Sequence, residues 1–175
     1  AEQMGQRLKN VSTIAKNPKT VVLHFGSNDL DCLGNSEDVM GAMCKLIRIA
    51  KKTFSGKPII VNSIIARRNT PQSLLQRTNQ NIRWACKELK AVYLDVGKYI
   101  NDSCLSRDGV HLNRKGSMTV SKIINKAILI CAQPKLKILL KNSENTKLTN
   151  NNAQDKLTST KSITVIEANM SKEIK

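Results

Sequence analysis

Short runs of β-branched residues alternate with longer segments of helical period, and this alternation constrains the fold most strongly. Three mainly apolar runs cover residues 20–25, 58–65 and 91–96, and glycine directly follows the first and the third. Continuously apolar runs of this length are typical of strands that are buried on both faces of a parallel sheet. Because helical segments separate the runs, the sequence predicts an α/β fold with three parallel strands.

Two helices are predicted between the strands and a third after them. Ser36 predicts the N-cap of the first helix, because acidic residues follow it where the helix dipole favours negative charge. Thr70 and Pro71 predict the N-cap and first residue of the second helix. The third is predicted after Gly116. Its apolar stripe comprises Val120, Ile123, Ile124, Ala127, Ile128 and Cys131.

The chain divides into two parts by composition. The apolar periodicity ends near Cys131, and the residues beyond it are rich in Asn, Lys, Ser and Thr. We therefore expect a folded domain over residues 1–132 and a disordered tail over residues 133–175. No run reaches the roughly 18 apolar residues that a bilayer crossing requires, so no membrane span is expected.

Charge is distributed over the whole chain. The formal net charge is +16, and residues 1–132 hold 21 Lys and Arg against 9 Asp and Glu. A basic surface concentrates polyanions without selecting among them. The charge alone does not decide between nonspecific nucleic-acid binding and a basic surface that is only solvated.

Cysteine and histidine usage bears on compartment and metal binding. The five cysteines are odd in number and include no CxxC pair, which favours a reducing, intracellular compartment. The two histidines, His24 and His111, are far apart in sequence and not near paired cysteines. The sequence therefore predicts no metal site, and no cofactor is expected.

A polar tetrapeptide follows the first predicted strand, at the sheet edge where α/β proteins bind ligands. It reads Gly26, Ser27, Asn28 and Asp29. An asparagine amide placed there can donate a hydrogen bond to an oxygen that acquires charge. The alternative is that Asn28 and Asp29 only build an Asx-turn.

A second polar cluster precedes the last predicted helix. Asp108 and His111 are three residues apart, a separation that can bring a carboxylate against an imidazole within one turn. The alternative is a surface Asp-Gly turn followed by an incidental histidine. His24, within a predicted buried strand, is expected to be a packed residue with a satisfied ring.

Together the two clusters resemble those of a known family. Residues 26–29 resemble the GxND block of SGNH/GDSL hydrolases, and residues 108–111 resemble their DxxH block. The order of the blocks and the intervening α/β units agree over roughly residues 20–131, and residues 79–83 resemble the helix before the penultimate strand. Residues 105–116 are most similar to SGNH-type domains of some animal retrotransposon-derived proteins.

The resemblance implies a flavodoxin-like three-layer α/β/α fold with a parallel sheet, and ester hydrolysis through an acyl-enzyme on a small ester substrate. It implies that Asn28 is the oxyanion donor, His111 the general base and Asp108 the residue that orients the base. The residues it implies to be structural at the site are Gly26, Asp29 and Gly109.

The nucleophile of the family is not visible in this sequence. No Gly-Asp-Ser precedes residue 26, and no predicted strand leads into Ser12. Other nucleophiles lack a supporting motif; they are Ser27, Ser63, Ser103, Ser106 and Cys104. We therefore expect an N-terminally incomplete domain without the family's first strand, inactive as it stands, whose serine lies upstream. The alternatives are a non-enzymatic nucleic-acid-binding or assembly module on an SGNH-like scaffold, and a decayed sequence without activity.

Overall fold

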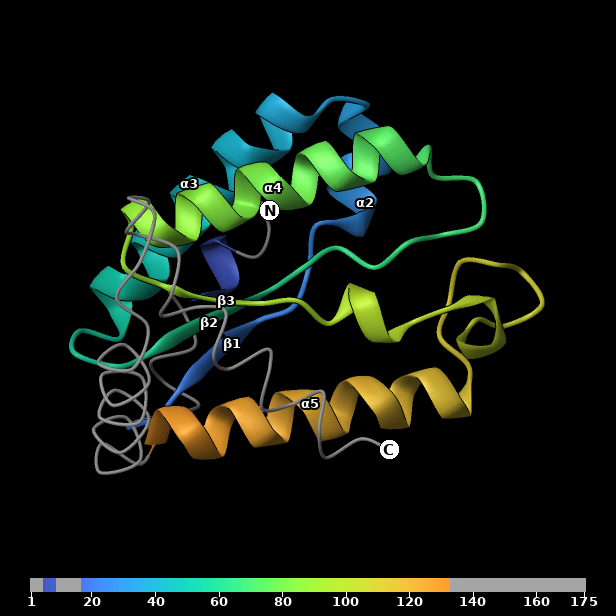
Figure 1. Ribbon diagram of the computed structural model, residues 1–175. Helices are drawn as coiled ribbons and strands as arrows, with labels where there is room; N and C mark the ends of the chain where they lie inside the picture. The colour runs from blue at the N-terminus through green and yellow to red at the C-terminus, as the bar shows by residue number, and fades with distance from the viewer. Residues whose placement is uncertain (1–4, 9–16, 133–175) are drawn as a thin grey trace, which may run out of the picture.

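A parallel sheet lies at the centre of the protein (Figure 1). The computed structural model describes residues 5–8 and 17–132. Its strands are β1 (Val21–Leu23), β2 (Ile59–Asn62) and β3 (Val92–Leu94), in the order β1-β2-β3 with both pairings parallel. The predicted α/β class and the three parallel strands are confirmed. The predicted tail, residues 133–175, lies outside the described residues.

The strands are shorter than the apolar runs that predicted them. Beyond β2 the backbone leaves the sheet after Ser63, whose N–H still donates to the carbonyl of Leu94 at 2.8 Å. Ile64 and Ile65 nevertheless stay 2 % and 9 % exposed. The connection is apolar because it is buried, although its backbone is no longer part of the sheet. The apolar composition therefore does not mark where the strand ends.

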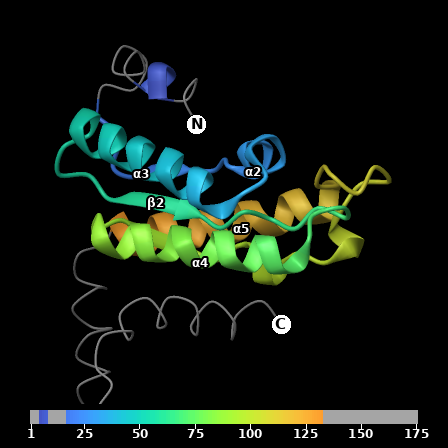
Figure 2. The same ribbon diagram turned by 90° about the horizontal axis from the view of Figure 1, so that it is seen from above.

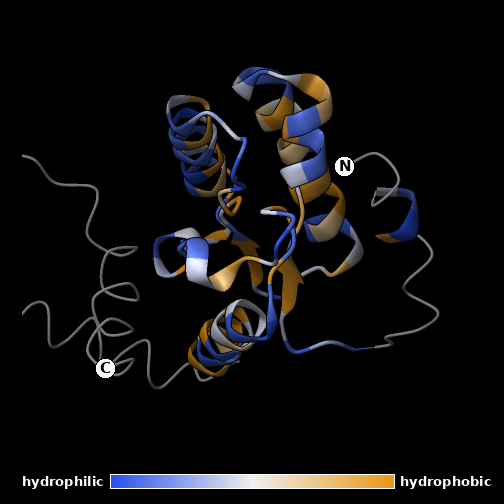
Figure 3. Cartoon of the chain, turned by 90° about the vertical axis from the view of Figure 1, so that its right-hand side faces the viewer, coloured by the Kyte–Doolittle hydropathy of each residue, from blue (hydrophilic) through white to orange (hydrophobic). Residues whose placement is uncertain are grey.

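Helices cover both faces of the sheet, and the predicted three-layer arrangement is confirmed. Helices α3 (Ser36–Thr53) and α4 (Gln72–Glu88) lie on one face, and α5 (Arg114–Ala132) lies on the other (Figures 1 and 2). Seen from the right-hand side of Figure 1, the strands are hydrophobic and the helices enclose them (Figure 3). Among the described residues, no helix has the length and apolar character needed to cross a bilayer.

The alternation of side chains along β2 divides the core in two. Ile59 and Val61 belong to the cluster that includes the inner faces of α3 and α4. Ile60 belongs to the cluster formed with α5. Because successive strand residues point to opposite faces, a single four-residue strand anchors all three helices.

Two predicted helix starts are displaced by one residue. The N-cap of α3 is Asn35, whose side chain accepts a hydrogen bond from the N–H of Asp38 at 2.8 Å, while Ser36 is already helical. Both residues are good N-caps by type, so side-chain chemistry did not distinguish them. Before α4, Pro71 occupies the N-cap and Thr70 lies outside the helix.

The start of α5 differs for a packing reason. The helix begins at Arg114, two residues before Gly116, and Asn113 Oδ1 accepts from the N–H of Gly116 at 3.0 Å. Gly116 therefore lies within the first turn and does not precede the helix. A Cβ there would collide with the carbonyl oxygen of Cys104 and lie 2.9 Å from Leu112 Cδ2. The glycine allows α5 to pack directly against the preceding segment.

We predict that Gly116→Ala destabilises the fold by about 1–3 kcal/mol, because a backbone carbonyl cannot move aside as a side chain can. The matched control is Gly41→Ala within α3, where no atom of the described residues beyond the helix's own backbone lies within 4 Å of the added Cβ. That substitution should stabilise by about 0.5–1 kcal/mol through helix propensity. Urea denaturation measures both changes, and equal midpoints for the two variants would contradict the packing argument.

Candidate functional site

The tetrapeptide with Asn28 forms the start of a short helix. Gly26 is the N-cap of α2 (Ser27–Leu33) with φ 112°, and a Cβ there would approach Ile64 Cδ1 to 3.2 Å. Glycine thus satisfies both the left-handed backbone and the close packing. The alternative of an Asx-turn is wrong for Asn28, because this residue lies in the first turn of α2. A seven-residue helix is too short for its apolar period to be recognised.

Arg67, from the segment after β2, fixes the side chain of Asn28. Its Nη2 donates to Asn28 Oδ1 at 2.8 Å, and its Nη1 is paired with the carboxylate of Asp31. A guanidinium can only donate, so the amide must present its oxygen to Arg67. The Nδ2 of Asn28 makes no hydrogen bond within the described part of the chain. The amide is therefore held with its donor available.

Asp108 and His111 form a hydrogen-bonded pair within a single turn. Asp108 Oδ2 lies 2.6 Å from His111 Nδ1, while Oδ1 accepts from the N–H groups of Val110 at 2.9 Å and His111 at 3.0 Å. One carboxylate thus builds the turn and orients the ring. The His111 side chain is 78 % exposed and that of Asp108 is 48 % exposed, so the pair faces solvent.

The same contacts set the protonation of Asp108. The hydrogen bond from His111 first, and then those from the N–H groups of Val110 and His111, hold the pKa of Asp108 well below its ordinary value. A lowered folded-state pKa adds stability that is present above the ordinary carboxyl pKa. That stability is lost as the pH falls through the lowered value. Asp108 is consequently an anion at neutral pH.

Arg68 connects the Asp108 turn to the segment that holds Asn28. Its N–H donates to the carbonyl of Gly109 at 2.8 Å, and its Nη1 donates to the carbonyl of Arg107 at 3.1 Å. A Cβ on Gly109 would lie 2.7 Å from Arg68 Cβ, so glycine is required for this approach. Asn28 and the Asp108 turn thus contact consecutive residues, Arg67 and Arg68.

His24 takes a different position from the one predicted. It lies just after β1 and is exposed, so a buried strand position is wrong. Its ring is nevertheless hydrogen-bonded, since Nδ1 accepts from Asn62 Nδ2 at 2.9 Å. Partial desolvation lowers the pKa of His24. An uncharged ring is consistent with the donor that it faces.

No hydroxyl or thiol group is hydrogen-bonded to His111 in the part of the chain that the structure describes. Ser63 is buried, and its Oγ accepts from the N–H of Gly97 at 2.9 Å. Ser103 Oγ donates to Asn101 Oδ1 at 2.6 Å and accepts from Lys115 Nζ at 2.8 Å. Ser12 lies outside the described residues. Within residues 5–8 and 17–132 there is also no group of three potential metal ligands.

Three residues that support the site were not predicted as such. The position of Arg67 after the second predicted strand suggested either a side chain at the mouth of the site or a solvated arginine, but its bond to Asn28, 39 positions earlier in the sequence, was not predicted. Asn113 links two elements, since its Nδ2 donates to the carbonyls of Ser103 and Leu105 while its Oδ1 accepts from the first turn of α5. The third, Asn79, bonds the N–H and the carbonyl of Ile64 in the segment after β2. It lies in the stretch 79–83 that carries part of the family resemblance.

The comparisons with known proteins identify the family and the fold. The family model for the GDSL-like lipase/acylhydrolase family matches residues 1–118. The chain belongs to this family. No curated protein shows significant similarity to it.

Solved structures similar to this GDSL-like chain include esterases. One described as TesA matches with TM-score 0.62 at 14 % identity, covering 74 % of this chain and 71 % of its own. A carbohydrate esterase family 3 protein from Talaromyces cellulolyticus matches with TM-score 0.62 at 19 % identity, covering 71 % and 63 %. A family 3 carbohydrate esterase from Clostridium thermocellum matches with TM-score 0.61 at 19 % identity, covering 75 % and 68 %. The chain thus spans less than two thirds of the Talaromyces protein. At these identities the matches show the fold.

We predict that Asp108→Asn changes the tautomer of His111. In the native protein Asp108 accepts the Nδ1 proton, so the neutral ring carries its lone pair on Nε2. An asparagine can either donate to Nδ1 or accept from it, and both tautomers should then be populated. The ¹⁵N chemical shifts of the ring nitrogens, recorded where the ring is neutral, measure their ratio. His24 is an internal control with its lone pair on Nδ1, and an unchanged His111 spectrum would contradict the assignment.

Proposed function

We propose that this GDSL-like domain contributes the acid–base and oxyanion parts of an ester-hydrolysing site that acts on small acyl esters. In this proposal His111 is the general base, Asp108 orients it, and Asn28 Nδ2 donates to the tetrahedral oxyanion. The observation that carries it is that Asn28 and the turn containing Asp108 and His111 contact the consecutive residues Arg67 and Arg68. Family membership supports the reaction class.

The hydrogen bonds are of the kind that acyl transfer needs. Asp108 accepts the Nδ1 proton, which leaves Nε2 to take a proton from a nucleophile and stabilises the imidazolium that results. Arg67 occupies the oxygen of the Asn28 amide, so the donor is oriented before charge develops on the substrate. Gly26, Asp29 and Gly109 would shape the two turns in this proposal.

The nucleophile is proposed to come from outside the described residues. Ser63 and Ser103 are engaged in other hydrogen bonds, and Cys104 is 2 % exposed. A hydroxyl on a further segment beside His111 Nε2 would complete the site. In the proposed arrangement the described residues by themselves have little or no hydrolytic activity.

Ester hydrolysis by the protein should depend on His111 and Asn28. His111→Gln removes the basic nitrogen and should lower kcat for p-nitrophenyl acetate by about 10²–10⁴-fold. Asn28→Ala removes one oxyanion donor and should lower kcat by about 10²–10³-fold with a smaller change in KM.

His24→Gln is the matched control for the histidine substitution, because it leaves an acceptor for Asn62 and lies outside the Asp108 turn. We expect turnover close to that of the native protein. Native turnover in His111→Gln would refute the proposed general base.

A second candidate function, nonspecific nucleic-acid binding, is favoured by the outer face of α5. Arg114, Lys115 and Lys122 line a shallow depression of about 430 Å³ with Met118. Backbone phosphates would be the natural partners of such cations. This binding would also suit the retrotransposon-derived subfamily that residues 105–116 resemble.

Binding to double-stranded DNA should be steeply salt-dependent under this second candidate. The double variant Arg114→Gln with Lys122→Gln should reduce the slope of log K against log salt by about two. Lys57→Gln, between α3 and β2, is the control. Weak binding that does not change with salt would exclude this function.

A further inference from the structure

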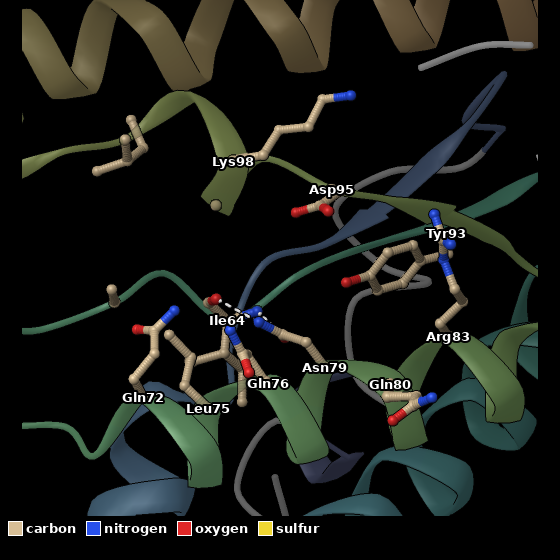
Figure 4. Close-up of a pocket in the computed structure, with 13 residues that line it drawn as sticks. Ile64, Gln72, Leu75, Gln76, Asn79, Gln80, Arg83, Tyr93, Asp95 and Lys98 are labelled. Carbon is tan, nitrogen blue, oxygen red and sulfur yellow. Dashed lines mark hydrogen bonds between the residues drawn. The ribbon is translucent and has the colours of Figure 1, made fainter. Parts of the chain in front are cut away.

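A second cavity lies between α4 and the segment that follows β3 (Figure 4). Its volume is about 510 Å³, within the range of about 300–1,000 Å³ that is usual for small-molecule sites. Its lining includes none of the residues proposed for ester hydrolysis. The cavity needs an occupant whose chemistry matches its walls.

The wall formed by α4 presents a row of side-chain amides. Gln72, Gln76 and Gln80 recur at four-residue spacing and line the same cavity. Within the described residues these three amides have no hydrogen-bond partner. Asn79, by contrast, is fully used, since it bonds both the N–H and the carbonyl of Ile64. The free amides offer donors and acceptors together.

The opposite wall presents a carboxylate. Asp95 lies just after β3, and its side chain points into the cavity (Figure 4). It has no hydrogen-bond partner among the residues that the structure describes. The wall beside it is fixed, because the N–H of Gly97 donates to the buried Ser63 Oγ. Since an ionised carboxylate only accepts, the ligand must supply hydrogen-bond donors here.

The charged side chains at the rim of the cavity indicate which charge a ligand can carry. Arg83 lies 5.2 Å from the centroid of the Tyr93 ring, and Lys98 lies 5.0 Å from that of Tyr99. A cationic ligand would be repelled by these two side chains and by the net charge of +16. An anionic ligand would be repelled by the carboxylate of Asp95. Neutral hydroxyl groups, which both donate and accept, satisfy the carboxylate and the amide row without either repulsion.

We infer that this cavity binds a neutral saccharide of one or two rings. A neighbouring cavity of about 310 Å³ is lined in part by Arg67 and Arg68. It shares Ala66, Gln72 and Ile100 with the proposed saccharide cavity. The saccharide site therefore opens toward the segment that contacts Asn28 and Gly109. Binding there goes beyond the proposed ester hydrolysis and does not require turnover.

Two-dimensional ¹H–¹⁵N NMR of the 175-residue chain tests the site. The probes are cellobiose, xylobiose and N,N′-diacetylchitobiose, each titrated separately. At least one should give saturable shifts of the Gly97 backbone amide and the Gln76 side-chain amide. Asp95→Asn should weaken that affinity about tenfold, because a charged acceptor is replaced by a neutral one. Gln76→Leu, in the amide row that lines the cavity, should weaken it as well.

Glu88→Gln is the matched control, since the same change of carboxylate to amide is made outside the cavity at the end of α4. Its affinity should equal that of the native chain. No saturable shift with any disaccharide would refute the inference, as would shifts produced only by inorganic phosphate or only by lysine amide. An inactive esterase that gives the shifts refutes the proposed function alone, and an active esterase without them refutes the saccharide site alone.

Discussion

The segment that leaves β2 organises the candidate site through its two arginines. Arg67 bonds Asn28 and Asp31 on α2. Arg68, the next residue, bonds the turn that contains Gly109. Surface ion pairs contribute little stability on average. The Arg67 side chain is only 18 % exposed and bonds two groups at once, so it constrains geometry more than an exposed pair would. The relative placement of the two polar clusters depends on these contacts.

The core positions that segment before either arginine acts. Ile64 is buried against the α3 and α4 side of the sheet, and Asn79 of α4 bonds its N–H and its carbonyl. A buried backbone that leaves a sheet needs such partners, because unpaired polar groups are costly away from water. Asn79 therefore transmits the packing of α4 to the segment. Hydrophobic packing fixes the helix, the helix fixes Ile64, and the chain then places Arg67 and Arg68.

Most of the fold was predictable from the sequence, and less of the site was. Burial repeats with the period of each element, so the three strands and the inner stripe of α5 could be recognised from local pattern. The helix that begins at Ser27 has no such period over its seven residues. The pairing of Asp108 with His111 is local and could be anticipated from their spacing. The bond from Arg67 to Asn28 is not local, and no single-sequence pattern encodes a contact across 39 positions.

The exposure of His111 limits what the described residues can do by themselves. An oriented base and an oriented amide lower a barrier most when water is excluded, because both interactions weaken in a high dielectric. Here the His111 side chain is 78 % exposed, so Asp108 provides orientation without desolvation. In the proposed esterase, the segment that brings the hydroxyl must therefore also cover the ring. The same requirement explains why the lowered pKa of Asp108 alone, which arises from hydrogen bonds in an open turn, does not amount to a complete site.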